Sequence, residues 1–139
     1  MLDLSSLQKA LATLDETIQR ATDSSLMGGL DKVTQNAVRA GVIQHFEFTY
    51  ELCWKFIQRW IRLNRTPEDA EPRARKELFR LAAEYGLIED PVPWFDYAEA
   101  RNLTSHTYDE VKAERVYEAS LRFLPDARYL LEKLEQNNG

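Results

Sequence analysis

The stretch IQHFEFTYELCWKFIQRW, residues 43–60, decides the fold of this chain. Its apolar side chains recur at alternating intervals of three and four residues, as Ile43, Phe46, Tyr50, Cys53, Ile57 and Trp60. That spacing places them on one face of an α-helix, because a helix turns once in about 3.6 residues. We therefore predict a long helix over residues 34–63 with a buried face that is rich in aromatic side chains.

Similar apolar stripes occur near the two ends of the chain. The first consists of Leu4, Leu7, Leu11, Leu14 and Ile18, and the last consists of Val116, Ser120, Phe123, Ala127, Leu130 and Leu134. Each stripe predicts a helix with one buried face; the last helix runs from Tyr108, and Pro125 is expected to kink it. Residues 23–29, which contain the pair Gly28-Gly29, are predicted to be a connection that ends any helical pattern.

Two shorter helices are predicted between the long segments. The first covers residues 72–85, with Pro72 in its first turn and Gly86 just past its end, the positions that favour these residue types. The second covers residues 90–101 and is still shorter; it delivers Arg101 to its end.

No strand pattern or internal repeat competes with these helices. Short connections between amphipathic helices favour antiparallel neighbours. The sequence therefore predicts an all-α fold, an up-and-down antiparallel four-helix bundle with one additional short helix. A length of 139 residues is typical of one domain, so residues 1–139 are expected to form a single helical-bundle domain.

Composition limits the classes of function. The net charge of −5 argues against broad nucleic-acid affinity. One cysteine, Cys53, and two histidines are too few for a typical metal cluster, so neither metal nor cofactor is expected. No apolar run approaches the roughly 18 residues of a membrane helix and no signal peptide is apparent, so a cytoplasmic location without membrane contact is expected.

Charge is unevenly distributed along the chain. Residues 59–80 carry four acidic side chains and seven basic ones, namely Arg59, Arg62, Arg65, Arg73, Arg75, Lys76 and Arg80. This basic zone is either an ordinary solvated face or a surface that follows the phosphates of a nucleic acid.

The long helix carries a second line of side chains, Glu47, Glu51, Trp54 and Gln58. A helix in a small monomeric bundle needs only one buried stripe, so Trp54 and Gln58 are predicted to face a partner, most simply in a two-fold homodimer. The alternative is that Trp54 covers the flank of its own bundle.

The eight residues RNLTSHTY, which begin at Arg101, combine three side chains of chemical interest; we call them the Arg–His–Tyr motif. Arg holds phosphate, His transfers protons near neutral pH, and Tyr offers a hydroxyl. In a continuous helix Arg101 and His106 would point about 140° apart, so they share a site only if the backbone changes course. Thr107 and Glu110 have the spacing of a capping box, which predicts a helix start with Tyr108 in its first turn.

These residue types also have purely structural roles. An Arg at a helix end often complements the helix dipole, and a Tyr at a helix start often packs. His45, the other histidine, is expected to be a boundary or interface residue rather than a catalyst. Glu47 and Glu51 lie one turn apart and are expected to hold an Arg such as Arg101 by a charge-assisted bond, rather than to form a carboxylate pair.

Residues 43–55, followed by Arg101-Asn102 and by His106-x-Tyr108, resemble the nucleotidyltransferase substrate-binding protein family of the HEPN superfamily. The resemblance covers nearly the whole chain and implies a dimeric four-helix bundle encoded beside a minimal nucleotidyltransferase. In such a pair the chain would be the toxin and its partner the antitoxin. The resemblance further implies that Arg101 and His106, supported by Asn102, form a ribonuclease centre, which the partner silences by attaching AMP to Tyr108.

The residues suit metal-independent RNA cleavage. That reaction needs proton transfer at the 2′-hydroxyl and at the leaving oxygen, which a His performs, and charge stabilisation of the phosphorane, which an Arg performs. One chain offers one His at the motif, so a site composed from two copies across a dimer axis would supply a second.

Two other functions remain open from the sequence. The chain resembles the substrate-binding half of antibiotic nucleotidyltransferases, so it would alternatively be a non-catalytic subunit that presents a substrate to a partner enzyme. Such an adaptor would tolerate the loss of Arg101 and His106, whereas a nuclease requires both. An inert dimerisation scaffold would explain the apolar stripes and leave the motif without a role.

Overall fold

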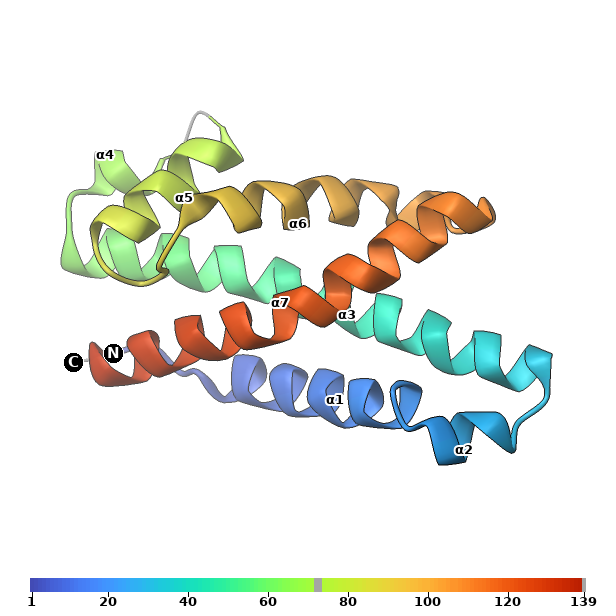
Figure 1. Ribbon diagram of the computed structural model, residues 1–139. Coiled ribbons are helices and arrows are strands. Elements are labelled where there is room, and N and C mark those ends of the chain that lie inside the picture. Colours follow the sequence, from blue (N-terminus) through green and yellow to red (C-terminus); the bar gives the residue numbers. More distant parts are fainter. Residues whose placement is uncertain (72–73, 139) are drawn as a thin grey trace.

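The computed structural model describes residues 1–71 and 74–138, and within them it contains helices and no strands (Figure 1). The helices are α1 (Ser5–Ala21), α2 (Ser24–Gly28), α3 (Lys32–Asn64), α4 (Pro67–Ala70), α5 (Arg75–Glu84), α6 (Pro91–Leu103) and α7 (Glu110–Gln136), with a 3₁₀ turn η1 (Thr104–His106) before α7. The predicted all-α fold is confirmed.

Four of these helices, α1, α3, α6 and α7, run up and down in alternation along the bundle (Figure 1). The third helix of the bundle is α6, whereas α5 packs at one end against α3 and α6. The relative lengths differ from the prediction, because α5 has 10 residues and α6 has 13. Pro72, predicted to begin the helix before Gly86, lies outside the described residues.

The predicted apolar stripes form the core. All the stripe residues of α1 and α7 are buried, and on α3 only Ile43 is partly exposed. Phe123 of α7 lies at the centre, with the ring centroids of Phe46, Tyr97 and Trp94 at 5.1, 5.2 and 5.6 Å in edge-on arrangements. Such pairs add to the free energy of burial and fix ring orientation. The core therefore holds α6, whose last turn carries Arg101, against α3 and α7.

The turn after α5 has the geometry that the sequence predicts. Gly86 has φ +79°, the left-handed conformation that glycine adopts without steric cost. Its N–H donates to the Ala83 carbonyl at 3.1 Å, and the Leu87 N–H donates to the Ala82 carbonyl at 2.9 Å. These two bonds satisfy carbonyls at the helix end, as in a Schellman motif.

Residues 23–29 were predicted to be a connection without helix, and this prediction is wrong, because they contain α2. The Asp23 side chain accepts a hydrogen bond from the Leu26 N–H at 3.1 Å and so caps a single short helix. Gly29 follows as the C-cap, so the glycine pair ends α2 instead of preventing it.

The start of α7 also differs from the prediction. Asp109, not Thr107, is the N-cap: its carboxylate accepts from the Val111 and Lys112 N–H groups at 2.9 and 3.2 Å. Asp caps a helix as well as Thr does, and Thr107 is already the C-cap of η1. Tyr108 therefore precedes α7 instead of lying in its first turn.

Helix α7 contains a proline near its middle and is followed by a residue that binds the start of the chain. Pro125 lies inside the helix, where it removes an N–H, and the ribbon changes direction near the middle of α7 (Figure 1). Beyond the C-terminal end of α7, Asn138 binds the start of the chain, because its side chain accepts from the Leu2 N–H at 2.8 Å and donates to the Leu2 carbonyl at 2.9 Å.

None of the described helices combines the length and apolarity that crossing a bilayer requires.

Candidate functional site

The Arg–His–Tyr motif spans the junction between α6 and α7, at the end of the bundle opposite to the two termini (Figure 1). The α-helical path stops at Leu103, and Thr104–His106 continue as a 3₁₀ turn. The Thr104 hydroxyl donates to the Arg101 carbonyl at 2.8 Å and closes the end of α6. The change of helix type that a shared site would require is therefore present between Arg101 and His106, and that the two side chains share a site stays a prediction.

The Arg101 guanidinium reaches from α6 to two carboxylates of α3. Its Nε donates to Glu51 Oε1 at 2.9 Å, and its Nη2 lies 3.7 Å from Glu47 Oε1. The expected contact of these glutamates with Arg101 is confirmed. The Arg101 side chain remains 33% exposed, so the guanidinium is anchored on one edge and accessible on another.

Trp54 and Gln58 make their contacts within the chain. The Trp54 indole N–H donates to Glu51 Oε2 at 2.9 Å, and the Gln58 amide donates to the Ala70 carbonyl at 2.8 Å. The guanidinium of Arg75 lies 3.7 Å from the centroid of the Trp54 ring system. These contacts agree with the alternative that Trp54 covers the flank of its own bundle, and a partner contact at this face stays a prediction.

The remaining motif side chains lie at the surface. His106 and Asn102 are exposed, and Tyr108 is 83% exposed. The His106 and Tyr108 rings are arranged edge to face, with their centroids 6.1 Å apart. An exposed imidazole and an exposed phenol on one turn are open both to a polymeric substrate and to a modifying enzyme.

The other residues with reactive side chains lie elsewhere. His45 is half-buried and lines a shallow groove of about 500 Å³ together with Lys9 of α1 and Phe48 of α3. Cys53 is fully buried in the core, and this burial raises the pKa of its thiol, which keeps it protonated and unreactive. No group of three or more His, Cys, Asp or Glu residues in the described part of the chain is arranged to hold a metal ion.

The basic zone lies on the later turns of α3 and on α5, and several of its cations stack on aromatic rings. The pairs are Arg59 over Phe56 at 5.1 Å, Arg65 over Tyr85 at 4.5 Å, and Lys76 and Arg80 over Phe95 at 5.4 Å each. Arg73 lies outside the described residues. These side chains therefore cover apolar surface with their stems, and a role in following phosphates stays a prediction.

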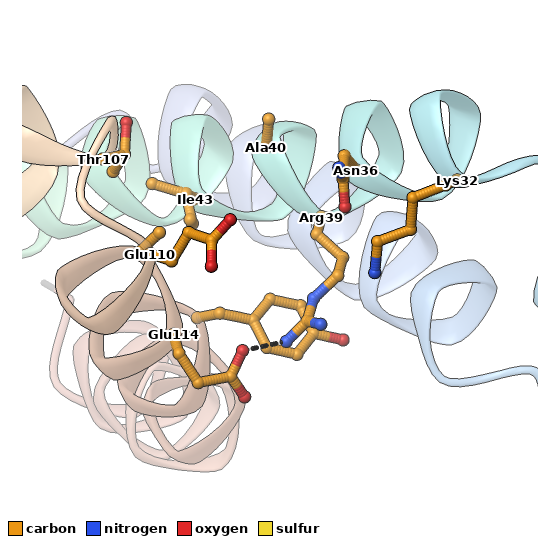
Figure 2. A pocket seen from close by; sticks show the side chains of 10 residues that line it. Lys32, Asn36, Arg39, Ala40, Ile43, Thr107, Glu110 and Glu114 are labelled. Atoms are coloured by element: carbon orange, nitrogen blue, oxygen red, sulfur yellow. Dashed lines mark hydrogen bonds and ion pairs between the residues drawn. The ribbon is translucent and has the colours of Figure 1, made fainter.

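A larger groove, of about 650 Å³, separates the first halves of α3 and α7 (Figure 2). Charged side chains from both helices line it, and Thr107 of the motif lies at its edge. Arg39 pairs with Glu114, and its guanidinium lies 4.1 Å from the centroid of the Tyr117 ring. The sequence alone does not reveal this groove, because Arg39 and Glu114 lie 75 positions apart and no motif joins them.

Comparison with known proteins places the chain in a family. The family model "Nucleotidyltransferase substrate binding protein like" matches residues 2–136. A Haemophilus influenzae protein named "Probable ribonuclease HepT" is 36% identical over 138 residues, which cover 99% of this chain and 94% of the relative.

Two solved structures resemble the fold. One is a Haemophilus influenzae protein with the fold of a substrate-binding domain of a nucleotidyltransferase; it has a TM-score of 0.90 and 36% identity, covering 96% of this chain and 100% of that one. The other is a Thermus thermophilus protein with a TM-score of 0.70 and 31% identity, covering 92% of this chain and 98% of that one. The chain therefore belongs to the nucleotidyltransferase substrate-binding protein family of the HEPN superfamily.

Proposed function

We propose that this protein is a HEPN-type toxin, a metal-independent endoribonuclease that acts through Arg101 and His106. A partner minimal nucleotidyltransferase neutralises it by transferring AMP to Tyr108. The observation that carries the proposal is the Arg101 guanidinium, anchored on Glu51 at the junction that exposes His106. The identity of 36% with a protein named "Probable ribonuclease HepT" supports the same reaction.

Arg101 and His106 have distinct tasks in the proposed cleavage. The accessible edge of the Arg101 guanidinium holds the charged phosphorane, which is the species that most needs stabilisation. The His106 imidazole transfers a proton, taking it from the 2′-hydroxyl or giving it to the 5′-oxygen that leaves. Asn102, exposed on the last turn of α6, is available to the same substrate.

A homodimer completes the proposed site. One imidazole cannot deprotonate the nucleophile and protonate the leaving group in the same step, so two copies of His106 are needed for concerted cleavage. A two-fold axis near the motif would bring both copies to one phosphate. Since the motif occupies one end of the bundle, a second copy reaches it without rearrangement of the core.

The proposed silencing reaction uses the exposed phenol. The Tyr108 oxygen attacks the α-phosphorus of ATP in the partner's active site, pyrophosphate leaves, and the phenolic proton passes to a base or to water. The resulting phosphodiester carries about one negative charge and would compete with RNA for Arg101. An exposed fraction of 83% gives the partner free access to this hydroxyl.

The nuclease assignment is tested with single substitutions. His106→Ala and Arg101→Ala are each expected to lower the rate of RNA cleavage by about 10²-fold or more, because each removes a proton-transfer group or a charge-stabilising donor. Activity of the unmodified protein is expected to persist in EDTA.

His45→Ala is the matched control, because His45 is the other histidine of the chain and lines the groove between α1 and α3, away from the motif. It is expected to cleave RNA at the wild-type rate. If either motif variant also cleaved at that rate, the assignment of this site would be wrong, and loss of activity in EDTA would contradict the metal-independent reaction.

The silencing proposal is tested by co-expression with the neighbouring nucleotidyltransferase. The intact mass is expected to rise by one or more AMP units, and Tyr108→Phe is expected to abolish this gain while cleavage escapes suppression. Tyr129→Phe, at a half-buried position of α7, is the control that keeps the gain. A mass increase that survives Tyr108→Phe would place the modification on another residue.

A second candidate function is that of a non-catalytic subunit that presents a substrate to a partner enzyme. The groove of about 650 Å³ favours it, because this volume suits a small molecule and its lining has both charges (Figure 2). An adaptor of this kind would not cleave RNA, and its activity with the partner would survive His106→Ala. Cleavage assays of the wild-type protein and of His106→Ala therefore separate the two candidates.

A further inference from the structure

Glu51 has both of its carboxylate oxygens committed to named donors. Oε1 accepts from Arg101 Nε at 2.9 Å, and Oε2 accepts from the Trp54 indole N–H at 2.9 Å. The carboxyl torsion of a free glutamate is broad, so a carboxylate with one partner swings easily. The second bond fixes that torsion and thereby fixes the direction in which Oε1 meets the guanidinium.

Trp54 is itself held from another helix. The Arg75 guanidinium of α5 lies 3.7 Å from the centroid of the Trp54 ring system, close enough for a strong cation–π contact. The same guanidinium donates to the Tyr50 hydroxyl at 3.1 Å, and Tyr50 is buried in the core. Arg75 therefore joins the Trp54 ring to a fixed point.

We propose that Trp54 and Arg75 are positioning residues that act on Arg101 through Glu51. This inference rests on the proposed nuclease function of Arg101. The chain of contacts runs from the core hydroxyl of Tyr50 through Arg75, Trp54 and Glu51 to the guanidinium, and each link is a contact already described. Glu47 does not replace Glu51 as the anchor of Arg101, because the Glu47 carboxylate oxygen lies 3.7 Å from Arg101 Nη2 and a partly exposed pair at that distance is weak.

The contacts have a consequence for the rate of cleavage. A guanidinium that stabilises a phosphorane must be held near its productive geometry, and a misplacement of about 1 Å costs a rate factor of up to roughly 10². Loss of the Trp54 N–H releases Glu51 on one side only. We therefore expect Trp54→Phe, which keeps an aromatic ring for Arg75, to lower kcat about tenfold while KM stays within about twofold.

Trp60→Phe is the matched control for the indole N–H. Trp60 lies on the same helix, and its N–H donates at 3.2 Å to the carbonyl of Asn137 near the termini. Arg75→Met is expected to lower kcat like Trp54→Phe, with Arg59→Met as its control, since Arg59 stacks on Phe56 at 5.1 Å. Both controls are expected to keep the wild-type kcat.

A spectroscopic readout tests the positioning without the reaction. In ¹⁵N-labelled protein the Nε–H resonance of Arg101, identified by its absence in Arg101→Lys, is expected to shift and to exchange faster with water in Trp54→Phe and in Arg75→Met. It is expected to be unchanged in Trp60→Phe and Arg59→Met.

The kcat values and the Arg101 resonance distinguish failure of the positioning role from failure of the proposed nuclease function. An Arg101 resonance that stays unchanged in Trp54→Phe, or a wild-type kcat in that variant, would overturn the positioning role. A wild-type protein that cleaves no RNA would refute the proposed function, and the resonance would still decide whether Trp54 and Arg75 hold Arg101.

Discussion

Arg101 differs from the arginines on the outer surface of α7 in how its charge is used. Arg115 and Arg122 pair with Asp96 of α6 while their side chains are more than half exposed. Pairs of that kind contribute about 0–1 kcal/mol and are screened by salt. Arg101 and Glu51 are 33% and 29% exposed and joined by a direct hydrogen bond, so their contact sets geometry at least as much as it sets stability.

Cys53 provides a prediction about pH at the scale of one side chain. Burial raises the pKa of this thiol in the folded protein, whereas in the unfolded chain it ionises near pH 8.5. Above that pH the unfolded state releases a proton that the folded state keeps. The free energy of unfolding is therefore expected to fall, by up to about 1.4 kcal/mol per pH unit, as pH rises from about 8.5 to 10.

Urea unfolding measured at several pH values in this window checks that slope. Burial also raises the pKa of the Tyr50 and Tyr97 hydroxyls, so these tyrosines add to the slope as pH approaches 10, and the difference in slope between the wild-type protein and Cys53→Ala isolates the thiol. Cys53→Ala is expected to be less stable overall, through lost packing, and to have a shallower slope than the wild-type protein. Equal slopes in the two proteins would contradict the assignment to Cys53.

At the scale of elements, the short α5 connects the core to the site. Its buried face carries Leu78 and Phe79, and its first residue, Arg75, reaches Trp54 on α3. The Gly86 turn then redirects the chain, and Asp90 begins α6 by accepting from the Val92 N–H at 3.0 Å. The ends of α5 therefore determine both the position of Arg75 and the start of the helix that carries Arg101.

Substitution of Gly86 tests the importance of that turn. Gly86→Ala is expected to lower the free energy of unfolding by about 1–2 kcal/mol, since φ is +79° and an L-residue is strained there even though the space around it is open. Gly28→Ala, at the end of α2 where φ is not positive, is expected to be neutral or mildly stabilising. Thermal unfolding of both variants measures the difference, and similar shifts of the same sign would count against the argument.

The helices were predictable where local spacing determines them, as in the stripes that end at Ile18 and Leu134, because burial of one apolar face supplies most of a helix's stability in a folded protein. Helix ends were less predictable. Thr107 and Asp109 are both good caps, and only the folded path through η1 decides between them. The contact of Arg101 with Glu51 followed from residue types, whereas the groove and the stack of Arg75 on Trp54 depend on how separate helices cross.

At the scale of the whole molecule, the bundle separates its two ends. The junction of α6 and α7 carries the Arg–His–Tyr motif, and the opposite end carries α4, α5 and the clasped termini (Figure 1). Near the motif, Tyr108 and Val111 are 83% and 80% exposed, and together they offer apolar surface to a partner. We therefore expect the proposed second copy of the chain to contact this end.

The dimer is the prediction that belongs to this scale. Sedimentation at micromolar concentration is expected to give twice the mass of one chain, with the two motifs facing each other near the axis. Val111→Glu is expected to shift the protein toward monomer, because it buries a charge on each side of that contact. Val92→Glu, at an equally apolar position that is 62% exposed at the start of α6, is the control that stays dimeric. A protein that sediments only as a monomer would contradict the composite site.

The hydrogen bonds between Leu2 and Asn138 mean that the same arrangement of helices could be encoded in a different order along the gene. Because Leu2 and Asn138 are hydrogen-bonded to each other, a short linker joining the two ends of the chain would close it into a ring without disturbing α1 or α7. Such a ring tolerates new ends at an exposed connection, as circular permutants generally do. If the ring were opened between α2 and α3, the gene would begin with α3 and finish with α1 and α2. Glu51 of α3 and the Arg–His–Tyr motif would then both be synthesised before α1.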